Sequence, residues 1–334
     1  MANITYAINS FIMNEIKLSG KDVQSAVSSR EWFLTRIENE IKRRNNEPSL
    51  YSGPLLDSPF VRFGSYFKGT KVSNVDEFDI LVVIDSRSGY FSIRDKHYGT
   101  GEGSANPNHK YDAKYKKSDD SGVSPRKILN WLKDVVKTVT DAYDGTVPDT
   151  DKQAITARIE SKDLSIDLVP AGIFTRDTDK SVFYNIPRGD KENGWIVTSP
   201  RDDIELLASV AKDKDRFRDI IRLCKYIRTA YNFLVPSFAI ESGVVQYGQN
   251  YRWKDNLYVD LYYALWYLEE KFKEGKIPAP YDSTNLLAGI SSLEWYAERL
   301  SIIRNEMTKL TKENDQTAIN EKITALFKNE RTNH

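Results

Sequence analysis

The sequence predicts an α+β protein of two parts, in which a mixed α/β part is followed by an all-helical part. Two strongly apolar strand segments lie in the first part, FDILVVI at 78–84 and LSIDLVP at 164–170. After residue 200 the apolar residues recur at helical spacing instead. This change of pattern predicts two domains, at 1–198 and 199–334.

Two helices are expected ahead of the first strand. Apolar residues recur at helical spacing in residues 4–16 and again in the longer segment 21–43, which we expect to brace the sheet. Arg30 interrupts the apolar face of the longer helix. We expect this arginine to pair with a carboxylate or to extend its charged end to solvent, and a contact with phosphate is the less favoured alternative.

Polar segments separate these helices from the later strands. Residues 44–60 are expected to form a loop, and residues 86–123 a longer loop in which short strands are expected at 90–94 and 111–115. Within the second loop, the run GTGEGS at 99–104 is similar to a phosphate-binding loop, but no helix pattern follows it, so we expect a hairpin tip. Irregular chain is expected from 174 to 194.

Capping signals mark the starts of later helices. Ser124 followed by Pro125 predicts one helix start, and Ser199 followed by Pro200 predicts another. From the second start onward, helices are expected at 200–211, 215–233, 236–247, 257–274, 291–311 and 316–328.

The overall composition restricts the class of protein. With 334 residues, 40% of them apolar, the chain can bury a sizeable core. The 48 basic and 48 acidic residues cancel, so net charge gives no sign of duplex nucleic acid as an obligatory partner, although a local basic groove would escape this count. The single cysteine, Cys224, excludes a disulfide framework and a Cys-based zinc site. A cytoplasmic location is expected, because the sequence shows neither a signal peptide nor a membrane-spanning run.

The most informative segment is FGSYFKGTKVSNVDEFDILVVI at 63–84. Glu77 and Asp79 are two residues apart in a predicted strand, so both side chains point to one face. Neighbouring carboxylates repel, and a cation that prefers oxygen ligands, such as Mg²⁺, relieves the repulsion. Upstream, Gly64 and Ser65 are expected to present backbone N–H groups at a helix start, where an anion binds. A phosphate site beside a metal site indicates phosphoryl or nucleotidyl transfer.

Asp167 is the expected third carboxylate. It lies on a predicted strand among apolar residues, where an unpaired carboxylate would be costly. Three convergent carboxylates predict two Mg²⁺ ions about 4 Å apart, with Mn²⁺ as a substitute. Glu77 and Asp79 would bridge both ions, and Asp167 would orient the ion on the attacking hydroxyl. Each feature taken singly is more often structural, but the ordered set on two apolar strands favours a nucleotidyltransferase site.

The segment at 63–84 resembles the active-site segment of the cyclic GMP–AMP synthase and oligoadenylate synthase group, in the polymerase-beta-like nucleotidyltransferase superfamily. LSIDLVPAGI at 164–173 resembles the strand that carries the third carboxylate in that group. IIRLCKYI at 220–227 and PSFAIES at 236–242 resemble its C-terminal helix pair. The resemblance implies a bilobed, polymerase-beta-like core with a C-terminal helical bundle.

The same resemblance implies nucleotide-binding roles in the helical part. Lys225 and Ser237 take the places of the lysine and serine that hold the nucleotide triphosphate. Phe238 takes the place of the aromatic residue that stacks on a base, although a core position is an equal alternative. Arg218 and Arg222 recur with Lys225 on one helix face, which is either a solvated basic face or a stripe that faces the triphosphate.

The chain departs from animal cyclic GMP–AMP synthase in one respect. That enzyme carries a Cys/His zinc insertion that grips DNA, whereas this chain has one Cys and three His. The chain resembles the bacterial branch more closely, the CD-NTases, which make cyclic di- or trinucleotide signals in antiphage defence. The resemblance implies nucleoside triphosphates as substrates, regulatory or effector proteins as partners, and no requirement for DNA or a membrane.

Two alternative functions stay open. The enzyme could instead be a linear oligoadenylate synthase or an RNA-tailing transferase, which would need a surface for a long acceptor. The chain could also be a nucleotide-binding relative that has lost catalysis, although the presence of all three carboxylates argues against that.

Trp195 is expected either to line the nucleobase pocket or to serve only in packing between the lobes.

Overall fold

The protein is described by a computed structural model whose contacts divide the chain into two compact units. We call Ser19–Phe67 with Val75–Asp202 the sheet unit, and Met1–Leu18, Lys68–Asn74 and Asp203–His334 together the helical unit. The structure describes residues 3–46, 60–72, 75–84, 89–93, 101–105, 115, 117, 123–142, 149–151, 153–175, 182–188, 194–280 and 284–330.

A mixed sheet forms the centre of the sheet unit. Its strand order is β1-β2-β7-β8-β9-β4-β3, and β6 pairs with both β7 and β5. The β2–β7 pair is parallel, and the other described pairs are antiparallel. The strands are β1 (Val61–Phe63), β2 (Glu77–Ile84), β3 (Gly89–Ile93), β4 (Gly101–Ala105), β5 (Asp149–Asp151), β6 (Ala154–Ile159), β7 (Leu164–Thr175), β8 (Val182–Pro187) and β9 (Trp195–Thr198).

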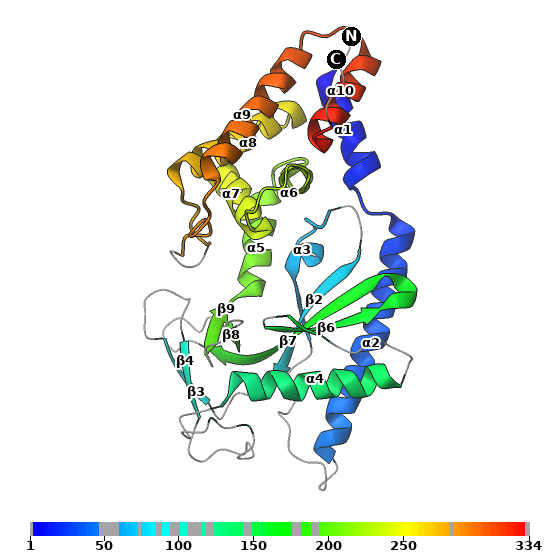
Figure 1. Cartoon of the computed structure of the whole chain (residues 1–334), viewed down its shortest axis with the longest axis vertical. Coiled ribbons are helices and arrows are strands. Elements are labelled where there is room, and N and C mark those ends of the chain that lie inside the picture. Colours follow the sequence, from blue (N-terminus) through cyan, green and yellow to red (C-terminus); the bar gives the residue numbers. More distant parts are fainter. Residues whose placement is uncertain are drawn as a thin grey trace. The chain divides into compact units, whose positions relative to one another are not determined.

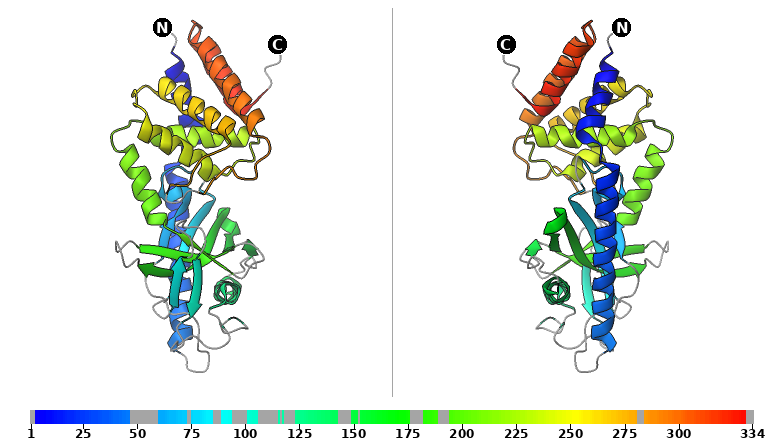
Figure 2. Two further views of the ribbon diagram at one scale, coloured as in Figure 1. Left: turned by 90° about the vertical axis from the view of Figure 1, so that its left-hand side faces the viewer. Right: turned by 90° about the vertical axis from the view of Figure 1, so that its right-hand side faces the viewer.

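Two helices, α2 (Gly20–Asn46) and α4 (Pro125–Asp141), supply the apolar cover of the sheet (Figure 1). Ile80 and Val82 of β2 lie in one buried cluster with the apolar residues of both helices. Because strand side chains alternate, the residues between and before them point to the opposite face. Figure 2 shows α2 as a long blue helix beside the strands. The expected bracing helix is therefore present.

The helical unit has its own buried core, formed by apolar residues from all its helices. Its first helix continues directly into a short π-helix, and α1 packs against α10 (Figure 1). The helices are α1 (Ile4–Phe11), η1 (Ile12–Ile16), α6 (Phe217–Ala230), α7 (Ser237–Asn250), α8 (Leu257–Glu274), α9 (Leu293–Leu310) and α10 (Gln316–Lys328). The helix α5 (Pro200–Ala211) starts in the sheet unit and ends in the helical unit. No helix among the described residues is long and apolar enough to cross a membrane.

The predicted α+β fold class is confirmed, with three local corrections. Residues 4–16 form an α-helix followed by a π-helix, where one α-helix was expected. The segment expected to be irregular contains β8, which is held between β7 and β9. Gly101–Ala105 is strand β4, where a hairpin tip was expected, and residues 99–100 lie outside the described part. In the two strand cases, pairing with distant segments decides a conformation that local sequence leaves open.

Candidate metal centre and nucleotide site

The parallel pairing of β2 and β7 brings the three predicted carboxylates together. Asp79 lies directly opposite Asp167. Glu77, two residues earlier on β2, lies opposite Ser165. Paired residues of neighbouring strands project to the same face, as do residues two apart on one strand. Glu77, Asp79 and Asp167 each offer a carboxylate oxygen, and these oxygens all lie within 4.8 Å of one another.

This carboxylate cluster fits a hard divalent cation. Its donors are all carboxylate oxygens, which Mg²⁺ prefers, and each of the three residues is partly exposed. Oxygens that bind one Mg²⁺ at about 2.1 Å lie at most about 4.2 Å apart, so small side-chain movements would complete the coordination. The negative charges repel one another until a cation binds, which favours occupancy.

Neighbouring hydroxyl groups fix the cluster in place. Thr156 of β6 lies opposite Asp167, and its hydroxyl donates to Asp167 Oδ1 at 2.7 Å. The Ser165 hydroxyl donates to the Asp76 carbonyl at 2.9 Å, directly before Glu77. Neither hydroxyl group was predicted from the sequence. Thr156 and Ser165 lie on the same sheet face as the acids, which can be recognised once the pairing of the strands is known.

Gly64 lies against the carboxylate of Asp79. It has a φ of +78°, and a Cβ at this position would lie 1.7 Å from Asp79 Oδ2. No side chain fits there, and the positive φ disfavours every residue except glycine. Gly64 begins α3 (Gly64–Phe67), directly after β1, and Ser65 is the second residue of this one-turn helix. The predicted phosphate-binding turn therefore adjoins the predicted metal site.

The remaining predicted nucleotide-binding residues lie in the helical unit. Ser237 and Phe238 are the first two residues of α7, where Ser237 is exposed and Phe238 is partly buried. The Lys68 ammonium lies 4.6 Å from the centre of the Phe238 ring. Lys225 of α6 is buried, with 7% of its surface exposed.

Lys225 belongs to a buried polar cluster with Lys68, Thr70 and Glu241, which we call the Glu241 cluster. Glu241 Oε1 accepts from Lys68 Nζ at 2.8 Å, and Oε2 accepts from the Thr70 hydroxyl at 2.7 Å and from Lys225 Nζ at 3.2 Å. Of these four residues, only Lys225 was predicted from the sequence to have a role. A signal for Glu241 was available, because it lies four residues after Ser237 on one helix face.

Two further side chains bear on earlier alternatives. Trp195 is buried in the sheet unit, and its indole N–H donates to the Val123 carbonyl at 3.3 Å. Its place at the nucleobase pocket or in packing between the lobes stays a prediction. Arg30 is buried and pairs with Glu31, and its guanidinium lies 4.5 Å from the centre of the Phe78 ring. The expected pairing of Arg30 with a carboxylate is confirmed.

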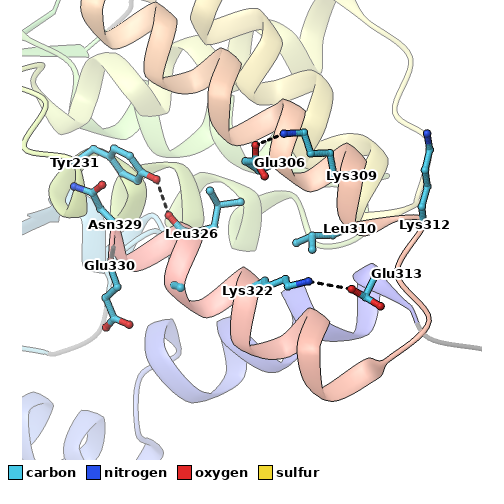
Figure 3. A pocket seen from close by; sticks show the side chains of 11 residues that line it. Tyr231, Glu306, Lys309, Leu310, Lys312, Glu313, Lys322, Leu326, Asn329 and Glu330 are labelled. Carbon is cyan, nitrogen blue, oxygen red and sulfur yellow. Dashed lines mark hydrogen bonds and ion pairs between the residues drawn. The ribbon is translucent and has the colours of Figure 1, made fainter. Parts of the chain in front are cut away.

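A cavity of about 500 Å³ in the helical unit contains none of the predicted site residues (Figure 3). It is lined by residues around α9 and α10, where Lys309 pairs with Glu306 and Lys322 pairs with Glu313. The charged groups of this cavity are thus largely paired with each other. A second cavity, of about 400 Å³, lies in the sheet unit and includes Glu77 in its wall.

Comparison with known proteins agrees with this geometry. Residues 66–183, which include all three carboxylates, match the Mab-21 protein nucleotidyltransferase domain. The structure of E. coli MS115-1 CdnC with ATP superposes with a TM-score of 0.68 at 13% identity, over 97% of each chain. The chain has the CD-NTase fold. A structure of CdnC in complex with HORMA-deltaN gives the same TM-score, 0.68, at 14% identity, over 98% of this chain and 97% of CdnC.

The expected resemblance to cyclic GMP–AMP synthase-like CD-NTases is therefore confirmed at the level of fold and nucleotidyltransferase domain. We found no curated protein that matches the chain by sequence. The sheet unit carries the carboxylates on β2 and β7, and the helical unit carries Lys225, Ser237 and Phe238.

Proposed function

We propose that this chain is a metal-dependent nucleotidyltransferase that joins nucleoside triphosphates into a cyclic di- or trinucleotide. The convergence of Glu77, Asp79 and Asp167 on one sheet face is the observation that carries the proposal. The match of residues 66–183 to a nucleotidyltransferase domain supports the chemistry. The likeness to CdnC, whose structure holds ATP, supports a nucleoside triphosphate as the substrate.

Each carboxylate has a proposed role. Glu77, Asp79 and Asp167 would hold the Mg²⁺ ions, with Asp167 on the side of the attacking hydroxyl. When bound, such ions lower the pKa of the hydroxyl and neutralise charge on the phosphates. Thr156 keeps Asp167 oriented, because its hydroxyl donates to Oδ1 at 2.7 Å.

Five residues have proposed roles in nucleotide binding. Gly64 and Ser65 would supply backbone N–H groups to the phosphates, and the close approach of Gly64 to Asp79 would bring these phosphates to the metal site. Lys225 and Ser237 would hold the triphosphate, and Phe238 would stack on a base. These three assignments rest on the resemblance to the nucleotidyltransferase family.

The proposed reaction conserves every atom. A 2′- or 3′-hydroxyl oxygen of one nucleotide forms a bond to the α-phosphorus of another, and the bond from that phosphorus to pyrophosphate breaks. The hydroxyl proton passes to solvent or to a carboxylate, and pyrophosphate leaves. A second step of the same kind closes the ring. Positioning and charge neutralisation supply most of the rate.

The biological role proposed is synthesis of a second messenger in bacterial antiphage defence. A regulatory protein partner is proposed as well, because the similar CdnC is known in a complex with HORMA-deltaN. An effector protein that binds the product would complete the pathway.

Product analysis tests the proposal directly. Purified protein is incubated with Mg²⁺ and labelled nucleoside triphosphates, and the products are treated with phosphatase and identified by mass spectrometry. A phosphatase-resistant cyclic product, with release of pyrophosphate, is expected. A ladder of phosphatase-sensitive chains would indicate a linear oligoadenylate synthase or an RNA-tailing enzyme. No pyrophosphate release with any triphosphate would indicate an inactive relative.

A further inference from the structure

The Glu241 cluster is an unusual use of buried charge. Glu241 has 4% of its surface exposed, Lys225 has 7%, and Lys68 has 8%. Burying charged groups is costly unless they are paired and hydrogen-bonded. Here both carboxylate oxygens accept hydrogen bonds, from Lys68, Thr70 and Lys225. Glu241 is thus the centre to which the other three groups bond.

Lys225 depends on this carboxylate for its charge. Its ammonium donates to Glu241 Oε2 at 3.2 Å, to the Thr70 hydroxyl at 3.2 Å and to the Thr70 carbonyl at 3.3 Å. Burial lowers the pKa of Lys225, Glu241 opposes this, and Lys68 and Lys71 lower the pKa further. Among the described residues, Glu241 is the carboxylate that pairs with Lys225.

Asp203 is a further acid near the cluster. Asp203 of α5 lies 3.8 Å from the Lys68 ammonium, and its side chain is 21% exposed. Burial acts to raise the pKa of Glu241, but Lys68 and Lys225 outweigh burial, so its pKa is lowered. Glu241 therefore stays ionised at neutral pH and faces two lysines.

The Glu241 cluster also anchors the chain that follows the predicted phosphate-binding turn. Lys68 comes three residues after Ser65, and Lys68–Asn74 belongs to the helical unit. Arg218 of α6 donates to the Lys68 carbonyl at 3.1 Å, and its side chain packs against Gly69, which has a φ of +68°. Thr70 is completely buried. This short segment is therefore held at three successive residues by α6 and α7.

We propose that Glu241 is a positioning residue for the triphosphate site, where it keeps Lys225 charged and oriented and anchors the segment after Gly64 and Ser65. The inference rests on the proposed function, because its readout is nucleotide affinity. Glu241 itself carries the wrong charge to bind phosphate. Its effect on the nucleotide therefore passes through Lys225, Lys68 and Thr70.

The experiment compares Glu241→Gln with Glu269→Gln in the full chain. Glu269 of α8 is a matched control, because it is also 4% exposed and pairs with two basic groups, Lys273 and Arg304, in the same unit. Binding of an ATP analogue with a methylene bridge between the α- and β-phosphorus is measured by calorimetry in Mg²⁺, so no turnover is needed. Thermal unfolding of each variant is recorded in parallel.

Glu241→Gln is expected to weaken binding of the analogue about 10- to 100-fold, the range for residues that orient the ligands of a site. Glu269→Gln is expected to lose similar thermal stability and to keep the affinity of the wild-type protein. The affinity of Glu241→Gln should also fall more steeply than that of the wild-type protein from about pH 7 to about pH 9, because a buried lysine without its carboxylate loses its proton more readily.

Thr70→Val provides a milder second variant if Glu241→Gln fails to fold. It removes the hydroxyl that bonds both Glu241 and Lys225, keeps all charges, and is expected to weaken binding about 3- to 10-fold. Affinity equal to wild type in folded Glu241→Gln or Thr70→Val, or equal weakening in Glu269→Gln, would overturn this inference alone. A wild-type protein that binds no triphosphate would overturn both this inference and the proposed function.

Discussion

Gly64 and Asp79 are so close that any side chain on Gly64 would occupy the position of the Asp79 carboxylate, with Cβ 1.7 Å from Oδ2. The two residues belong to neighbouring strands or their continuation, since Phe63 pairs with Asp79. The turn that would bind phosphate and the carboxylate that would bind metal are therefore in direct contact. Because β1 and β2 pair at this point, their pairing sets the distance between the two sites.

Gly64→Ala is expected to displace Asp79 and to abolish metal-dependent pyrophosphate release. The positive φ alone should cost about 1–2 kcal/mol of stability, and the overlap with the carboxylate adds to that cost. Initial rates and thermal unfolding are measured together. Gly20→Ala is the control, because nothing lies within 4 Å of a Cβ at Gly20. Activity in Gly64→Ala close to that of Gly20→Ala would contradict the proposed geometry.

Asp79→Asn is expected to eliminate pyrophosphate release while the protein stays folded. The amide has the same shape as the carboxylate but removes one negative charge from the cluster of three. Without metal, the variant should be as stable as wild type or more so, since like-charge repulsion is reduced. The thermal stabilisation that Mg²⁺ gives to the wild-type protein should largely disappear.

A matched control for this variant is Asp163→Asn. Asp163 is an exposed aspartate of the sheet unit with a φ of 47°, a conformation that asparagine tolerates. It lies outside the carboxylate cluster. Retained turnover in Asp79→Asn, or equal loss of the Mg²⁺ effect in Asp163→Asn, would show that the metal is held elsewhere.

Thr156→Val is expected to lower kcat about tenfold, in the range for groups that orient a metal ligand. It removes the hydroxyl that donates to Asp167 at 2.7 Å and preserves the shape of the side chain. Steady-state kinetics should show little change in KM, because the hydroxyl acts on the metal ligand and not on the nucleotide. Thr308→Val removes a hydroxyl that donates to a main-chain carbonyl in α9 and serves as the control. A kcat for Thr156→Val equal to that control would refute the role.

The sequence was sufficient to predict the carboxylates, and insufficient for the contacts around them. Glu77, Asp79 and Asp167 stand out locally because acids interrupt apolar strands. The bond from Lys68 to Glu241 joins residues 173 apart, and that from Thr156 to Asp167 depends on which strands pair. The contact of Lys225 with Thr70 could not be inferred from helix periodicity, since Thr70 lies 155 residues earlier in the chain. Strand β8 was missed because its conformation depends on pairing with β7 and β9, which its own sequence does not reveal.

Cys224 offers a test of the helical core that is independent of catalysis. Burial raises the pKa of its thiol to about 12, and the residue has 3% of its surface exposed. The thiolate is the reactive form, so at pH 8 only about one thiol in ten thousand would be ionised, even before access is considered. Labelling by a thiol reagent should therefore be slow in the native protein and rapid in denaturant. Because the pKa is raised, the labelling rate should increase with pH well above 8. Fast labelling of the native protein at neutral pH would mean that the Cys224 face of α6 is not packed in the core.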